Sequence, residues 1–266
     1  MKTLALSSYK PFALAGKTVA TLLLVFATGI VSAQLSPKAL IDSATACYTA
    51  GRYTDALNYY NQVLTSGQES ADLYYNAGNA AFKANEMAQA VWYYEKALKL
   101  NPADEDAAFN LGLANTRITD KIDQVPLLFY ERWWKAFVNL FSPDTWSVVS
   151  LLMLALAALA LLLFFQATTL WQRKGGFWMS LVFGILFAFS LSFAWKGTHR
   201  IVNHNEAIVF AATVTAKSSP DASGVDLFVL HEGTKVAVND QIGTWLRVKI
   251  ANGSEGWLEE GAVKRL

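Results

Sequence analysis

The chain of 266 residues is 53% hydrophobic and has a formal net charge of +1 at pH 7. Acidic residues outnumber basic ones in both 34–125 and 205–266, so neither segment has the basic character of a nucleic-acid-binding domain and we expect no nucleic-acid partner. The one cysteine, Cys47, excludes an internal disulfide and a cysteine-rich metal site.

Residues 1–33 have the pattern of a secretory signal peptide. Three lysines accompany the start of an apolar stretch that runs from Val19 to Val31, and the small residue Ala33 follows. We expect cleavage between Ala33 and Gln34. Because the apolar stretch is long for a signal, an uncleaved anchor helix is the alternative. In either case, the segment from Gln34 onward is expected outside the cytoplasm.

The segment 34–125 repeats itself with a period of 34 residues, as the pairs Ala56 and Ala90 and Tyr60 and Tyr94 illustrate. The best copy, ADLYYNAGNAAFKANEMAQAVWYYEKALKLNP, resembles the tetratricopeptide repeat. Small residues in this pattern let two antiparallel helices approach closely. The first copy is weaker and the third keeps only its first helix. Cys47 falls at a small-residue packing position, which favours a buried structural thiol.

Tetratricopeptide repeats usually bind a partner peptide on their concave face. Alignment with the repeat pattern predicts the partner-binding residues Tyr75, Asn76, Asn79, Phe82, Phe109 and Asn110. Asn76 and Asn110 match asparagines that hold a peptide backbone in some proteins of this family. Ile41 and Asp106 stand where capture of a terminal carboxylate would need lysine, so an acidic C-terminus is not the expected ligand. The alternative is that the aromatic residues only pack against neighbouring helices.

The segment 126–144 contains the stretch FYERWWKAFVNLF, which begins at Phe129. On a helical wheel, its charged side chains occupy about one third of the circle and its aromatic side chains fill most of the rest. This pattern is typical of an amphipathic helix that lies in a membrane interface, with the lipid bilayer as its partner. The alternative is a helix packed under the last repeat.

Two apolar stretches, 145–172 and 177–195, have no charged residue and are each long enough to cross a bilayer as a helix. The loop 173–176 between them carries Arg173 and Lys174, which favours the cytoplasmic side. Two crossings return the chain to its starting side, so the repeats and the C-terminal segment are expected together in the periplasm. The protein would then reside in the inner membrane of a bacterium.

The two spans are expected to serve as an anchor. They contain no Asp, Glu, Lys, Arg or His, which are the residues that mark ion and proton pathways. Gly184, Ala188 and Ser192 form a row of small residues at a spacing of four, and this row is the expected contact face between helices.

The segment 205–266 contains five short β-rich runs separated by turn residues, which predicts a small barrel. Its LHEGT, TWLRV and EGWLE motifs resemble the bacterial SH3-like domain. Strand alternation places Trp245 on the opposite face from the core residues Leu246 and Val248. Trp245 is therefore predicted either to line a ligand groove or to pack under the loop Ser218–Gly224. We expect this segment to fold independently.

The order of these parts, together with DKIDQVPLLFYERWWKAFVNLFSPDTW before the first span, resembles the BatE-type proteins of the bacterial aerotolerance (Bat) operon. The resemblance covers essentially the whole chain after the signal. It implies a membrane complex with von Willebrand factor A-type membrane proteins and a MoxR-type ATPase. It also implies a role in oxygen tolerance and envelope stress.

The sequence therefore predicts a multidomain membrane protein with all-α tetratricopeptide repeats, a two-helix transmembrane hairpin and a small all-β SH3-like barrel. We interpret it as a non-enzymatic adaptor with no catalytic residues, metal or cofactor. An enzyme would need a Cys–His pair or a metal cluster, and the three histidines have no thiol or carboxylate at ligand spacing. The alternative is an envelope sensor whose SH3-like domain binds peptidoglycan fragments.

Overall fold

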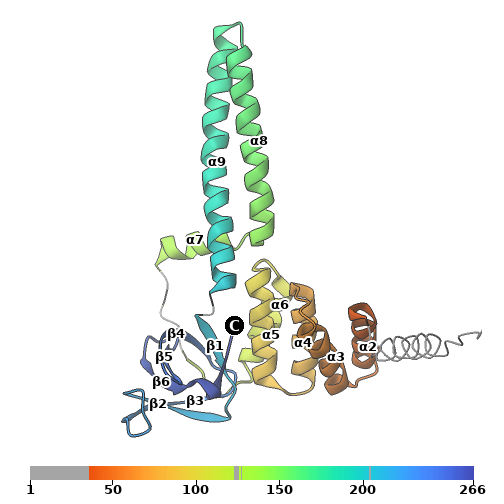
Figure 1. The fold of residues 1–266 in the computed structure, drawn as a ribbon, viewed down its shortest axis with the longest axis vertical. Helices are drawn as coiled ribbons and strands as arrows, with labels where there is room; N and C mark the ends of the chain where they lie inside the picture. Colours follow the sequence, from red (N-terminus) through yellow and green to blue (C-terminus); the bar gives the residue numbers. More distant parts are fainter. Residues whose placement is uncertain (1–35, 123–125, 127, 204) are drawn as a thin grey trace, which may run out of the picture.

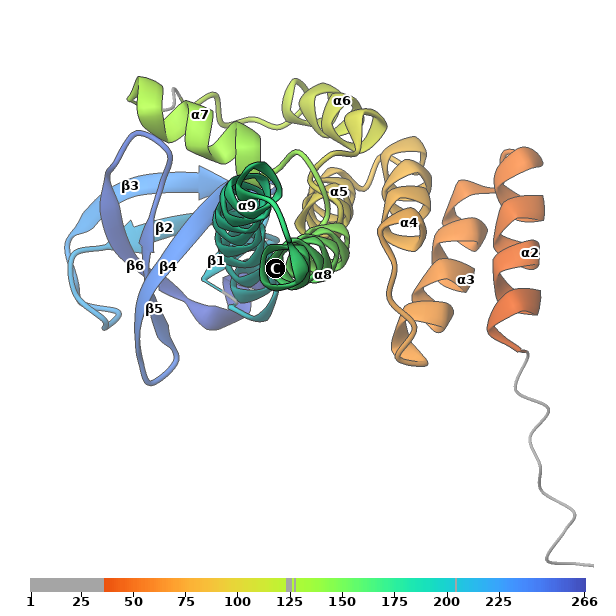
Figure 2. The same cartoon turned by 90° about the horizontal axis from the view of Figure 1, so that it is seen from above.

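The computed structural model describes residues 36–122, 126, 128–203 and 205–266. The predicted signal peptide, residues 1–33, lies outside the described residues. Figure 1 shows a long helical hairpin standing on a base that has two parts, a set of short helices and a β-sheet. Seen from above in Figure 2, the short helices and the sheet lie on opposite sides of the hairpin.

The repeat segment forms five short antiparallel helices. Ser36, Ser70 and Asp104 cap three of them, each accepting a hydrogen bond from a backbone N–H three residues later at 2.9–3.3 Å. Pairs of successive helices pack against each other, and the third pair has only its first helix, as the sequence predicts. The helices are α2 (Pro37–Thr49), α3 (Tyr53–Thr65), α4 (Ala71–Lys83), α5 (Met87–Leu100) and α6 (Glu105–Asn115).

Small residues bring these helices together, as expected. A Cβ atom added to Gly78 of α4 would lie 2.7 Å from the ring of Tyr94 on α5, so only glycine fits at this contact. Ala56 and Ala90, one period apart, are both fully buried. Cys47 is buried as a free thiol in the same core. The repeat interior is thus built from alternating small and aromatic side chains.

Helix α7 (Phe129–Val138) begins after Leu128, whose N–H donates to Glu131 Oε2 at 3.3 Å. Val138 is buried, whereas Trp133 and Phe137 are 62% and 58% exposed. Figure 1 shows α7 lying across the foot of α9, roughly perpendicular to the hairpin. The ring centroids of Trp134 and Phe193 are 5.1 Å apart at this crossing. The predicted amphipathic helix therefore packs on the hairpin and not under the last repeat.

Helices α8 (Pro143–Gln166) and α9 (Leu170–Val202) form the hairpin, and within the described part of the chain they are the two helices long and apolar enough to cross a membrane. Their connection lies earlier than the predicted loop 173–176. It comprises Ala167–Thr169, and 173–176 belongs to the first turns of α9. Thr169 Oγ1 accepts from Gln172 N–H at 3.4 Å, and Arg173 Nε donates to Ala167 O at 3.2 Å. These polar caps place the helix start before the charged residues.

The contact face of the hairpin also differs from the predicted row of small residues. A Cβ atom on Gly184 would meet no atom within 4 Å, so this glycine is not at the contact. The buried residues of α9 are instead Gly176, Ser190, Phe193, Ala194 and Gly197, of which Gly176, Ser190 and Gly197 are spaced in multiples of seven. A Cβ atom on Gly176 would lie 2.9 Å from the backbone of Phe164 on α8. A seven-residue spacing suits two long helices that pack at a small angle.

The C-terminal segment forms one seven-stranded antiparallel sheet, with the order β3-β2-β6-β5-β4-β1-β7. Among the described residues no pairing joins the edge strands β3 and β7, so the sheet is not closed as the predicted barrel. The first predicted run breaks at 210–212 into two strands. The strands are β1 (Glu206–Val209), β2 (Thr213–Lys217), β3 (Asp226–His231), β4 (Lys235–Ile242), β5 (Trp245–Lys249), β6 (Glu255–Glu259) and β7 (Val263–Arg265).

The sheet curls around a core of its own. Leu246 and Val248 of β5 are fully buried, while Arg247 and Lys249 on the opposite face are exposed, as strand alternation predicts. Trp245 is half-buried at the start of β5, where it pairs with Ile242 of β4 and Glu259 of β6.

The sheet also shares a core with the repeats, which the sequence does not predict. Ile208 of β1 and Leu266 are 0% and 1% exposed and pack among the buried residues of the repeat helices. Trp92 Nε1 of α5 donates to Arg265 O at 2.8 Å. Ile208 and Leu266 are thus covered by the repeat helices, while the main core of the sheet is built from its own strands, and independent folding of this segment stays a prediction.

Candidate functional site

The concave face of the repeats contains a groove of about 230 Å³. Its residues come from four helices, namely α2, α4, α5 and α6. One side is aromatic and apolar, and the floor carries two asparagine side chains. The lining residues are Tyr48, Tyr75, Asn79, Phe82, Lys83, Tyr94, Asn110 and Leu113.

A hydrogen-bond network fixes the floor of this groove. Asn79 Oδ1 accepts two hydrogen bonds, from Tyr94 Oη at 2.8 Å and from Asn110 Nδ2 at 2.9 Å. Asn110 Nδ2 also lies 3.3 Å from Tyr75 Oη. Burial, followed by the electrostatic influence of Tyr75 and Tyr48, raises the pKa of Tyr94 well above its usual range. Tyr94 is therefore a neutral donor at physiological pH, and it orients the amide of Asn79.

The orientation of the two amides leaves polar atoms available to a ligand. Within the described residues, Asn79 Nδ2 and Asn110 Oδ1 make no hydrogen bond. Asn79 thus offers a donor and Asn110 an acceptor from adjacent positions in the groove. An extended peptide presents alternating C=O and N–H groups and matches such a pair, because each of its backbone groups needs a partner when it leaves water.

Aromatic and aliphatic side chains form the walls. The guanidinium carbon of Arg117 lies 4.3 Å from the ring centroid of Phe82, so a cation covers one face of this ring. Leu113 of α6 also lines the groove and is 40% exposed. Lys83 is exposed at the rim. Such a surface suits a peptide with apolar side chains on either side of its backbone.

The groove brings together four of the predicted site residues, namely Tyr75, Asn79, Phe82 and Asn110. Two others lie outside it. Asn76 is exposed one position away on α4, and Phe109 is 72% exposed on α6. Asn76 follows Tyr75 and Phe109 precedes Asn110, but successive side chains on a helix point in directions 100° apart, so both point away from the groove.

Sequence reasoning missed the roles of Tyr94 and Lys83 in this groove. Tyr94 marks the repeat period in the sequence, and its ring lies in the core of the repeats, but its hydroxyl reaches Asn79 in the groove. The signal that could have found it is the 15-residue separation between Tyr94 and Asn79, which places them on facing turns of the two helices of one repeat. Trp245, the remaining predicted site residue, lies on the sheet and does not line this groove.

Comparison with known proteins agrees with the repeat assignment. Residues 41–105 match the family model described as tetratricopeptide repeat, so the chain carries a tetratricopeptide-repeat, protein-binding module. A crystal structure of MamA is similar to this chain at 16% sequence identity, covering 72% of this chain and 99% of that chain with a TM-score of 0.30. No curated protein matches the sequence.

Proposed function

We propose that this protein is a non-enzymatic, membrane-anchored adaptor that binds an extended segment of a partner protein in its tetratricopeptide groove. The observation that carries the proposal is the pair of unused amide atoms on Asn79 and Asn110, which are held in place by Tyr94. Structural asparagines in a closed core would have their hydrogen bonds satisfied inside the protein. Here the residues that carry the free donor and acceptor line the groove of about 230 Å³.

The membrane anchor is the α8–α9 hairpin. Most of its apolar side chains are exposed, as expected for helices whose outer surface faces lipid. The apolar face of α7 (Trp133 and Phe137) is also exposed, and Leu140 just after the helix extends it. With α7 lying across the foot of α9 (Figure 1), this face would enter the membrane interface when the hairpin is inserted.

The repeats and the sheet lie at the same end of the hairpin (Figure 1), which supports the proposal that both occupy one compartment. We assign that compartment to the periplasm of a bacterial cell, with Arg173 and Lys174 at the cytoplasmic end. A reporter enzyme that works only outside the cytoplasm should then be active after Leu266 and inactive at Gly175. The opposite pattern would invert this topology.

The partner that we propose follows from the resemblance to BatE-type proteins. The aromatic stretch that carries this resemblance forms α7 and the start of α8, next to the base of the protein. On the basis of this resemblance, we expect the groove to bind a von Willebrand factor A-type membrane protein. The complex would include a MoxR-type ATPase and act in aerotolerance or envelope stress.

Co-purification from detergent-extracted membranes tests this function. Phe82→Glu places a charge inside the groove and should remove the von Willebrand-type protein from the purified complex. Phe109→Glu is the matched control, because this exposed side chain on α6 lies outside the groove and its replacement should leave the complex intact. Equal retention by both variants would contradict the proposal.

The sheet carries a second predicted contact residue, Trp245, which stays a prediction. Retention of the full chain on peptidoglycan, abolished by Trp245→Ala, would favour the envelope sensor over the adaptor. Arg247 is the matched control on the same face of β5. Its replacement by Gln should leave such binding unchanged, because its charge is already paired with Glu255 at 2.7 Å.

A further inference from the structure

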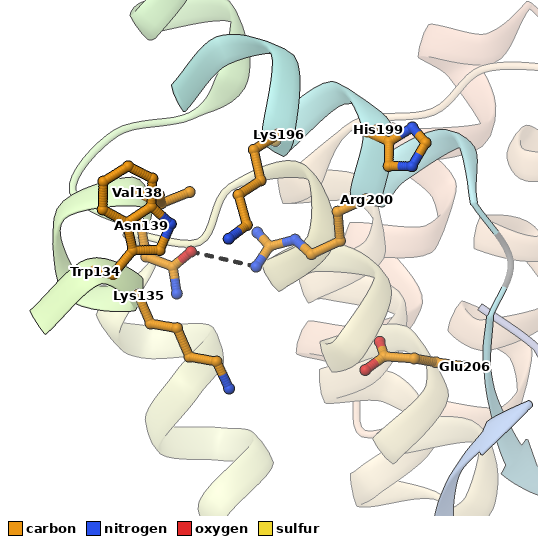
Figure 3. Close-up of a pocket in the computed structure, with 9 residues that line it drawn as sticks. Trp134, Lys135, Val138, Asn139, Lys196, His199, Arg200 and Glu206 are labelled. Atoms are coloured by element: carbon orange, nitrogen blue, oxygen red, sulfur yellow. Dashed lines mark hydrogen bonds between the residues drawn. The ribbon is translucent and has the colours of Figure 1, made fainter. Parts of the chain in front are cut away.

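A cavity of about 460 Å³ lies where α7 crosses the foot of α9 (Figure 3). Its lining residues come from α7, from the last turns of α9 and from the start of β1. They are Trp134, Lys135, Val138, Asn139, Lys196, Gly197, His199, Arg200 and Glu206.

This cavity is positively charged. Lys135, Lys196 and Arg200 line it, and Figure 3 shows the ends of Lys196 and Arg200 close together while Lys135 extends away from them. Among the described residues, none of the three is in an ion pair with a carboxylate. The one acid in the lining is Glu206, whose Oε2 lies 3.1 Å from Lys235 Nζ. Lys235 is shared with Glu95, whose Oε2 lies 2.8 Å from the same Nζ, so Glu206 keeps part of its negative charge and offsets part of the positive charge of the three cations.

Arg200 has hydrogen-bond donors that the described residues do not use. Its Nη1 donates to Asn139 Oδ1 at 3.2 Å, but its Nε and Nη2 are buried and have no acceptor. These two nitrogens share one edge of the guanidinium plane, and this edge matches two oxygens of one phosphate group. A buried donor without an acceptor is unfavourable, so these two nitrogens favour a group that brings oxygen atoms to them.

The position of the cavity indicates where the ligand comes from. It lies beside α7, whose apolar face is exposed, and at the end of the apolar part of α9. Lys196 Nζ lies 5.5 Å from the ring centroid of Trp134, and this pairing of a cation with an amphipathic ring is typical of the headgroup level of a membrane.

We propose that this cavity binds a phosphate group, supplied by the headgroup of an anionic phospholipid. Arg200 would hold two phosphate oxygens through Nε and Nη2, and the ammonium groups of Lys196 and Lys135 would neutralise the charge. Three cations and two free guanidinium donors exceed what the two oxygens of a carboxylate use, which favours phosphate over an acidic peptide. The inference rests on the membrane insertion of α8 and α9 in the proposed function.

Native mass spectrometry of the full chain in detergent tests the proposal with defined lipids. Wild-type protein should retain one phosphatidylglycerol molecule in preference to phosphatidylcholine. Arg200→Gln and Lys196→Gln should each weaken this retention about fivefold or more, as expected for the loss of one cation near a lipid surface. Lys196 is exposed, so its replacement leaves the packing of the fold intact.

Lys174→Gln is the matched control, since Lys174 Nζ lies 6.0 Å from the ring centroid of Trp171 at the other end of the hairpin. It should leave phosphatidylglycerol retention unchanged. Equal weakening by Lys174→Gln, or equal retention of both lipids, would overturn the proposal.

A parallel titration with inorganic phosphate separates the two sources of the ligand. Binding of inorganic phosphate that is sensitive to Arg200→Gln, without retention of phosphatidylglycerol, would overturn the lipid as the source. Carbonate extraction of membranes reports separately on insertion. If the chain is released by carbonate, the membrane anchor fails, whereas an inserted chain with no lipid preference overturns this inference alone.

Discussion

The two faces of the repeat array differ in whether their polar groups have hydrogen-bond partners within the protein. On the outer face, formed by α5, Trp92, Glu95 and Lys99 all have partners in the sheet or the segment before it. In the concave groove, the amides of Asn79 and Asn110 keep a donor and an acceptor unused. Aromatic residues are common on both faces, so composition does not distinguish a ligand site from an internal interface. The satisfaction of hydrogen bonds does distinguish them.

The largest effect is expected from disrupting the contact between the outer face of the repeats and the sheet. Ile208→Asp places an unpaired charge in the core shared by the sheet and the repeats, where the side chain is 0% exposed. The loss of stability should be about 3–5 kcal/mol, enough to release the sheet from α5. Hydrogen exchange of β1 and β7 in the full chain measures this release. Val229→Asp, on an exposed position of β3, is the control, and equal protection in the two variants would contradict a shared core.

Lys99 of α5 provides a second test of the contact between the repeats and the C-terminal segment. It is 8% exposed, and its Nζ donates to Asn203 O and Leu266 O at 3.0 Å each. Burial lowers the pKa of Lys99 below its usual range. Lys99→Met keeps the aliphatic chain but removes both hydrogen bonds, and it should cost about 1–3 kcal/mol. Denaturant unfolding followed by the fluorescence of the full chain measures the change. A stability equal to that of the wild type would show that these contacts contribute nothing.

Asp120, in the segment after α6, gives the contact between the repeats and the sheet a pH dependence. Its carboxylate accepts from Thr234 Oγ1 at 2.6 Å and from His231 N and Nδ1 at 2.7 Å. Burial alone would raise the pKa of Asp120, but these hydrogen bonds outweigh it, and the net pKa lies below the usual range. A depressed carboxyl pKa stabilises the folded state above the unfolded value of about 4, and this contribution is lost as the pH falls through the folded-state pKa.

The wild type should therefore lose protection of β3 and β4 from hydrogen exchange below about pH 4. Asp120→Asn should show weaker protection already at pH 7, by about 1–3 kcal/mol, and a flatter dependence on pH. Asp221→Asn in the loop between β2 and β3 is the control, because this carboxylate bonds only within its own loop. Identical pH profiles for wild type and Asp120→Asn would refute the role of this carboxylate.

The smallest effect on stability, with a clear effect on binding, is expected in the groove. Asn110→Ala removes the free acceptor and one of the two donors to Asn79 while leaving the helix intact. Partner affinity should fall about tenfold, which corresponds to about 1.4 kcal/mol for hydrogen bonds to a ligand backbone. Asn115→Ala, at the exposed end of the same helix, should bind normally. An unchanged affinity for Asn110→Ala would show that the amide pair does not contact the ligand.

The sequence predicts local features of this fold well. The 34-residue period, the close approach of α4 and α5 at Gly78, and the alternation along β5 all depend on contacts between residues near in sequence. The predicted groove residues Tyr75, Asn79, Phe82 and Asn110 follow from the same period. The docking of the sheet on α5 could not be predicted in this way, because Trp92 and Arg265 are 173 positions apart. A buried tryptophan in the repeat pattern looks the same whether a helix or a strand covers it.

The hairpin illustrates a second limit. The composition of the sequence identified both apolar helices. The spacing of four residues by which Gly184 was predicted, however, describes the surface of one helix and not the contact between two helices. The buried residues of α9 are instead Gly176, Ser190, Phe193, Ala194 and Gly197, and three of them recur in multiples of seven, as expected for two long helices in continuous contact. The open sheet, predicted as a barrel, likewise depends on whether two edge strands meet, which strand patterns do not specify.

Photocrosslinking in intact cells tests the central claim most directly. A photoreactive amino acid at Lys83, an exposed position at the rim of the groove, should capture a von Willebrand factor A-type membrane protein. The crosslink should map to one extended segment of that protein and should disappear when Asn110→Ala is added. The same probe at Phe109, exposed outside the groove, should capture much less. Equal crosslinking from both positions, or a crosslink from Lys83 that survives Asn110→Ala, would contradict peptide binding in the groove.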